Sequence, residues 1–168
     1  MNPQQLSKQT LKEAKEILSN TKVLDILANY GDVRIGGSFL TGLMLGPDID
    51  ITVATDTPRE SAIKFVNEII SKRLFQKIEY GDFEKFPRKN RNQDHIVVLA
   101  LEYANRKWEI EIWFTRHHYE DQIELEDKLI KLPANIKSQI IEAKYKRDQK
   151  GLDKHSLSSV EIYKSFLK

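Results

Sequence analysis

A glycine-serine pair and two closely spaced aspartates have the residue types and spacing of a site for metal-assisted phosphate chemistry. Gly37-Ser38 follows a short apolar run, and nine residues separate Ser38 from Asp48-Ile49-Asp50. Glycine lets the backbone turn tightly and approach a ligand, while the serine hydroxyl and the following amides can bind an anion such as a triphosphate. Carboxylates two residues apart on a strand lie on one face, where they can share hard divalent cations.

The segment that carries the two aspartates predicts a β-strand. Its polarity alternates with a period of two, so that one face is apolar and the other is polar. The apolar set is Ile49, Ile51 and Val53, and the polar set is Asp48, Asp50 and Thr52. We therefore expect the apolar set to face a core and the carboxylates to face an open cleft.

The remaining elements follow from hydrophobic periodicity and from start and stop signals. Thr57 and Ser158 each begin a capping-box pattern, and the proline after Thr57 suits the first turn of a helix. The predicted helices cover residues 11–27, 58–74, 119–130, 136–149 and 158–166, and the predicted strands cover 33–35, 49–53, 75–80, 95–103 and 107–114. This pattern predicts an α/β (α+β) fold, with a mixed β-sheet, helices packed on one face, and a helical C-terminal portion.

Length and composition limit the class of protein. The chain has 168 residues, of which 40% are hydrophobic, and this size predicts a single domain over 1–168, with a catalytic α/β core at 1–117 and a helical portion at 118–168. The absence of cysteine excludes disulfides and thiolate chemistry and is compatible with the cytoplasm, where we expect the protein. The longest apolar run, at 96–101, is too short to span a membrane, so we expect no membrane partner.

Charge gives little evidence for a nucleic-acid partner. The net charge is only +2, whereas proteins that bind polyanions usually carry a concentrated basic field. An acidic segment precedes a basic cluster, and solvated helix faces are the simplest explanation of both. The acidic residues are Glu120, Asp121, Glu124, Glu126 and Asp127, and the basic ones are Lys144, Lys146, Arg147, Lys150 and Lys154.

The two motifs together resemble the polymerase-β-like nucleotidyltransferase superfamily, whose members carry a G-S, a spacer of about this length and an acidic-hydrophobic-acidic strand. The matching segments are residues 35–38 and 48–53. The resemblance implies that Asp48 and Asp50 hold Mg²⁺, with a two-metal site and Mn²⁺ as a substitute, against an NTP, for which we expect ATP. The α-phosphate would then be attacked in line, with release of pyrophosphate.

The superfamily usually completes its site with an acidic residue on a later strand, and residues 108–114 fit that place best. Glu109 and Glu111 lie on one face of this predicted strand, so either could meet Asp48 and Asp50 if the two strands are neighbours. We favour Glu109 as catalytic residue and metal ligand, because it comes directly after the turn and one apolar residue. Glu111 stays open as the alternative catalytic acid, and an ordinary solvent-facing strand edge would also explain both.

The resemblance also suggests residues for nucleotide binding. Gly37 and Ser38 would form the phosphate turn, with Thr41 and Gly42 shaping the first helical turn after it. Lys144 and Lys154 would contribute cations from the C-terminal helices. A loop with Arg88, Lys89 and Arg91 could close over the substrate or contact an RNA acceptor, and Trp113 or Tyr145 could stack on a base, although packing explains aromatic residues more simply.

Three functions remain open at this stage. The leading one is transfer of a nucleoside monophosphate, AMP in our expectation, to a hydroxyl or phosphate of an acceptor, which could be a small molecule, an RNA end or a protein. Residues 109–112 loosely resemble the E-I-Q-I strand of alarmone synthetases, which transfer pyrophosphate instead. A non-catalytic module that binds a nucleotide or a partner protein, such as one component of a toxin-antitoxin pair, is the third.

Overall fold

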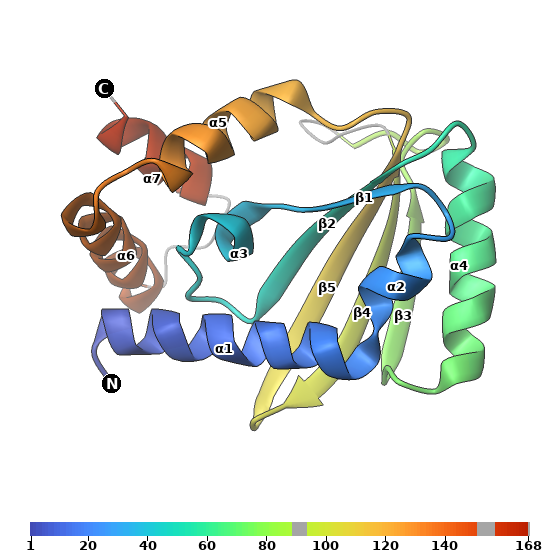
Figure 1. Cartoon of the computed structure of the whole chain (residues 1–168), viewed down its shortest axis with the longest axis horizontal. Helices are drawn as coiled ribbons and strands as arrows, with labels where there is room; N and C mark the ends of the chain where they lie inside the picture. Colours follow the sequence, from blue (N-terminus) through green and yellow to red (C-terminus); the bar gives the residue numbers. More distant parts are fainter. Residues whose placement is uncertain (89–93, 151–156, 168) are drawn as a thin grey trace.

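The computed structural model describes residues 1–88, 94–150 and 157–167. Within these residues, five strands form one sheet in the order β1-β2-β5-β4-β3 (Figure 1). Strands β2 and β5 run parallel, and the other neighbouring pairs are antiparallel. The strands are β1 (Asp32–Ile35), β2 (Asp48–Ala54), β3 (Lys77–Asp82), β4 (His95–Tyr103) and β5 (Arg106–Thr115). The mixed sheet predicted from the sequence is confirmed.

Some of the helices cover one face of this sheet, and the C-terminal helices form a separate group beside it. Figure 1 shows α5, α6 and α7 together on the left and α4 on the right, with the strands between them. None of the helices in the described part of the chain is long and apolar enough to cross a membrane. The helices are α1 (Pro3–Thr21), α2 (Val23–Leu27), α3 (Gly37–Thr41), α4 (Pro58–Lys72), α5 (Glu120–Ile130), α6 (Ala134–Gln149) and α7 (Ser159–Phe166).

The main core lies between the sheet and helices α1, α2 and α4. The alternation in β2 works as predicted, since its apolar residues are fully buried whereas its polar residues are half-buried. Phe65 and Ile69 of α4 and Phe114 of β5 lie in the same cluster. Burying each of these side chains stabilises the fold by about 1.5–3 kcal/mol. This burial holds β2 so that its carboxylates point away from helices α1, α2 and α4.

A second apolar cluster joins the motif-bearing loop to the C-terminal helices. Leu43 and Leu45, which lie between α3 and β2, pack with Leu129 of α5, Ile140 of α6 and Ile162 of α7. The loop that carries the spacer between the two sequence motifs is therefore anchored by residues about a hundred positions away.

Two local expectations differ from the structure. Thr57 begins α4, but its side chain makes no capping hydrogen bond, and its hydroxyl lies 3.4 Å from the Ser61 hydroxyl instead. The strand bounds predicted from the sequence leave a three-residue hairpin turn over 104–106, but Arg106 pairs with Tyr103. The turn is formed by Ala104 and Asn105 alone, with φ of 51° and 60°, as a two-residue turn with both central residues left-handed requires. At Ser158, by contrast, the predicted capping box is formed with Glu161.

Candidate active site

The two aspartates and the two candidate glutamates lie on adjacent parallel strands. Asp48 of β2 is opposite Glu109 of β5, and Asp50 is opposite Glu111. Because side chains alternate across a sheet, all four lie on the face that helices α1 and α4 leave open. The neighbouring strands that the third acid requires are therefore present.

Glycines make close contact with both aspartate carboxylates. Gly37 begins α3 with a left-handed φ of 61°, and a Cβ atom there would lie 2.1 Å from Asp50 Oδ2. At Gly46, a Cβ atom would lie 2.3 Å from Asp48 Oδ1. Real Cβ atoms do not come this near to oxygen, so each carboxylate occupies space that any other residue at these positions would fill.

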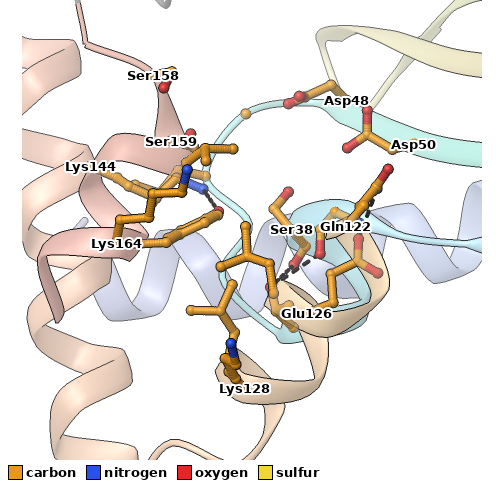
Figure 2. Close-up of a pocket in the computed structure, with 18 of the residues that line it drawn as sticks. Ser38, Asp48, Asp50, Gln122, Glu126, Lys128, Lys144, Ser158, Ser159 and Lys164 are labelled. Atoms are coloured by element: carbon orange, nitrogen blue, oxygen red, sulfur yellow. Dashed lines mark hydrogen bonds between the residues drawn. The ribbon is translucent and has the colours of Figure 1, made fainter. Parts of the chain in front are cut away.

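A cavity of about 1590 Å³ runs from this acidic face to the C-terminal helices. Figure 2 shows Asp48 and Asp50 on one side of it and Lys144, Ser158, Ser159 and Lys164 on the opposite side. The sheet and the turn contribute Gly37, Ser38, Thr41, Asp48, Asp50 and Glu111, whereas α6, α7 and the residue before α7 contribute Lys144, Arg147, Ser158, Ser159, Tyr163 and Lys164. The cavity is thus acidic at the end that β2 and β5 form, and the opposite end carries Lys144, Lys164 and Arg147, of which Arg147 is paired with Asp148 (2.7 Å). Helix α5 also contributes charged residues to the lining, namely Asp121, Glu124, Glu126 and Lys128.

Most of the predicted site residues line this cavity, two do not, and one lies outside the described residues. Glu109 is exposed and lies outside the lining, and Gly42 ends α3 with a φ of 74° without facing the cavity. Lys154 falls outside the described residues, as do Lys89 and Arg91 of the predicted basic loop. The other predicted positions on the turn, on β2 and at Lys144 lie together.

Lys144 is a buried cation that connects three parts of the site. Its side chain is almost inaccessible, and Nζ donates to the Leu43 carbonyl (2.7 Å) and to the Tyr163 hydroxyl (3.1 Å). The interpretation of the basic cluster as a solvated face is therefore wrong for Lys144, and also for Arg147, which is buried too. Buried charges are retained only where hydrogen bonds or opposite charges compensate for desolvation.

Tyr163 is buried, accepts a hydrogen bond from Lys144 and lines the same cavity. Burial raises its pKa well above the usual value near 10, and the negative charges of Asp50 and Asp48 raise it further, against opposing contributions from Ser159 and Arg147. The phenol therefore stays protonated at neutral pH and can accept from Lys144. Nothing in the sequence distinguished Tyr163 from an ordinary helix residue.

The aromatic residues considered for base stacking, and Arg88 of the basic loop, have packing partners within the chain. Trp113 packs against Phe83 with ring centroids 5.8 Å apart, and the Arg88 guanidinium lies 4.6 Å from the Phe83 ring. Arg88 also lines the cavity. Tyr145 packs against the second apolar cluster, so base stacking on Tyr145 or Trp113 stays a prediction.

The carboxylates of Asp48 and Asp50 suit a hard cation that is bound jointly by the protein and by the phosphates of a nucleotide. Within the described residues, no group of three or more histidine, aspartate or glutamate side chains is arranged to hold a metal ion alone. Asp48 and Asp50 do offer carboxylate oxygens on one wall of the cavity. Mg²⁺ is typically bound by one or two carboxylates together with substrate phosphates and water, so these residues fit that ion when a nucleotide is present.

Comparison with solved structures confirms the nucleotidyltransferase-like fold that the sequence predicts. The chain is similar to the polymerase core of TRAMP, an RNA surveillance complex, with a TM-score of 0.61 and 18% identity over 89% of this chain and 46% of that one. It is also similar to the Cid1 poly(U) polymerase bound to Mg and 3′-dATP, with a TM-score of 0.58 and 20% identity over 87% of this chain and 47% of that one.

A third similar structure is a cytoplasmic RNA terminal U-transferase, with a TM-score of 0.56 and 21% identity over 85% of this chain and 41% of that one. The chain thus spans less than half the length of each of these proteins. No family model and no curated protein matches the sequence. At these identities the likeness is one of fold, and activity must be argued from the site.

Proposed function

We propose that the protein is a metal-dependent nucleotidyltransferase that transfers AMP from ATP to a hydroxyl or phosphate acceptor and releases pyrophosphate. One observation carries the proposal: Asp48, Asp50, Ser38 and the buried Lys144 all line one cavity. Anionic oxygens for a cation and positive groups for phosphates are the two requirements of phosphoryl chemistry, and both are present here. The similar fold of known polymerases and a U-transferase supports the proposal.

In this mechanism the two ends of the cavity have different tasks. Ser38 and the cations Lys144, Arg147 and Lys164 would bind the triphosphate and orient the bond to be broken. Asp48 and Asp50 would hold Mg²⁺, which when bound supplies charge neutralisation at the reacting phosphate. The acceptor oxygen forms a bond to the α-phosphorus while the bond to the pyrophosphate oxygen breaks.

We propose Glu111, instead of the initially favoured Glu109, as the third acid. Glu111 lines the cavity beside Asp50, whereas Glu109 is exposed and lies outside the lining. A carboxylate in this place can accept the proton that the acceptor hydroxyl loses as it attacks. The extra methylene of glutamate, compared with aspartate, lets the carboxylate reach further into the cavity.

An RNA end is the acceptor to test first. The similar structures are described as a polymerase core of an RNA surveillance complex, a poly(U) polymerase and an RNA terminal U-transferase. Arg88 adds a cation to the cavity lining near the acidic end, where it can contact a phosphodiester. We place the activity in the cytoplasm, in keeping with the absence of cysteine.

The test is a transfer assay with each NTP labelled at the α-phosphate. Purified protein is incubated with Mg²⁺ and either total RNA or an extract of small metabolites, beside the variant Asp48→Ala/Asp50→Ala. Label that moves to an acceptor, and fails to move in the variant, supports the proposal and identifies both substrates.

Two outcomes would contradict the proposal. Release of AMP together with transfer of pyrophosphate would identify an alarmone-type pyrophosphokinase. Binding of NTP without any transfer would identify a non-catalytic binding module.

A further inference from the structure

A buried carboxylate from a distant helix contacts the phosphate turn from the side opposite the catalytic acids. Glu126 of α5 is 3% exposed, although it belongs to the acidic segment for which the sequence suggested a solvated face. Its Oε1 accepts a hydrogen bond of 2.5 Å from the Gly37 amide and one of 2.9 Å from Gln122 Nε2. The interpretation as a solvated face is therefore wrong for this residue.

The turn lies between Glu126 and Asp50. A Cβ atom at Gly36 would lie 2.8 Å from Glu126 Oε1, and a Cβ atom at Gly37 would lie 2.1 Å from Asp50 Oδ2. The Gly36 amide also donates to the Asp50 carbonyl (2.9 Å). Any displacement of the turn away from Glu126 would consequently press on the backbone or the carboxylate of Asp50.

An arginine on β1 lies against the second carboxylate oxygen of Glu126. Arg34 Nη1 lies 2.5 Å from Glu126 Oε2, and the Arg34 side chain is 23% exposed. Removing one partner of such a buried pair is costly, because the other charge stays desolvated. Arg34 is on β1, directly opposite Thr52 of β2. The ion pair of Arg34 with Glu126 therefore connects α5 to the strand that precedes the turn.

We propose that Glu126 is a positioning residue of the active site, which holds the Gly36-Gly37 turn and through it the carboxylate of Asp50. The inference rests on the proposed nucleotidyl transfer for its kinetic consequence. Glu126 acts through Gly37 and not on the nucleotide, since its Oε1 is already engaged by Gly37 and Gln122 and its Oε2 faces Arg34. Its loss therefore lowers kcat by a larger factor than it raises the KM for the nucleotide, which would rise to some extent because Ser38 on the same turn would contact the triphosphate.

The kinetic test compares Glu126→Ala and Glu126→Gln with Asp127→Asn, an exposed neighbour on the same helix. We expect kcat to fall about 30-fold to 100-fold in Glu126→Ala, since small misplacement of a reacting group is costly. Glutamine keeps an oxygen for the Gly37 amide, so its loss should be about 3-fold to 10-fold. Asp127→Asn should stay within about 2-fold. A kcat in Glu126→Ala equal to that of Asp127→Asn would overturn the inference.

Amide hydrogen exchange tests the same inference without activity. The Gly37 amide should exchange about 10-fold faster or more in Glu126→Ala than in the wild type, while the amides of β4 stay unchanged. Unchanged exchange at Gly37 would overturn the inference, as would a general rise throughout the sheet. Failure of the wild type to transfer any label would refute the proposed function alone, because the exchange comparison decides the role of Glu126 in either case.

Discussion

Asp50 on β2 lies directly opposite Glu111 on β5 in the parallel register of the sheet, and both residues line the cavity. The pair one step earlier, Asp48 and Glu109, shares the register, but only its aspartate lines the cavity. The two glutamates lie on the same face of β5, and each has an aspartate opposite it. They differ in that Glu111 lines the cavity and Glu109 does not. The following predictions depend on this arrangement and on the contacts around it.

The first prediction separates the two glutamates. Glu111→Gln should lower the rate of transfer by about 100-fold or more, because it removes the acceptor's proton-accepting group, whose usual contribution is of about that size. Glu109→Gln should lower it by about 3-fold at most. Initial rates with α-labelled ATP measure both. Equal losses in the two variants would refute the assignment of this role to Glu111 instead of Glu109.

The second prediction concerns the close approach of the turn to Asp50. Gly37→Ala should abolish transfer, because the new methyl group would overlap Asp50 Oδ2 and displace it. Gly42→Ala provides the matched comparison: its φ is also left-handed, at 74°, but a Cβ atom there would meet nothing within 4 Å. Gly42→Ala should therefore cost only the backbone strain of about 1–2 kcal/mol. Thermal unfolding and transfer assays on both variants separate strain from displacement, and retained activity in Gly37→Ala would refute the prediction.

The third prediction concerns the buried cation Lys144. Replacing it by methionine leaves the Leu43 carbonyl and the Tyr163 hydroxyl without their donor, so the free energy of unfolding should fall by about 1–3 kcal/mol. The KM for ATP should rise about 10-fold if Lys144 also attracts the triphosphate. Lys146→Met, on the exposed side of α6, should change neither quantity. Urea unfolding and steady-state kinetics make the comparison, and a similar KM in both variants would argue against a phosphate-binding role.

The fourth prediction is a dependence of stability on alkaline pH. Burial raises the pKa of Tyr163 in the folded chain above the value near 10 that it has when exposed. Above pH 10 the unfolded chain therefore loses this proton first, and the stability that the protonated phenol provides is lost as the pH rises towards the folded pKa. The free energy of unfolding should fall more steeply in the wild type than in Tyr163→Phe from about pH 10 to about pH 12, and the two curves should run parallel below about pH 9. Curves from urea unfolding that stay parallel above about pH 10 would contradict this.

Local patterns carried much of the information about the fold. The alternation in residues 48–53 predicted the position of β2 and the orientation of its aspartates away from the core. This works because side chains of a strand alternate between its two faces in any surroundings. Ser158 and Glu161 began α7 through a capping box, which depends on neighbours three positions apart. Thr57 carries the same pattern but caps with its backbone alone, so the local signal located the helix and not its hydrogen bonds.

The helices, the strands and the common face of the two acids on β2 could be predicted from the chain, because they follow from periods of 3.6 and two residues. Which glutamate lines the cavity, and which charged residues of the C-terminal helices are buried, depends on how distant elements pack together. Glu126 and Lys144 looked like members of solvated charge runs, and they are buried only because Gly37, Arg34 and Leu43, all about ninety or more positions away, provide their partners. Such contacts depend on strand register and helix packing, which no periodic pattern along the sequence predicts.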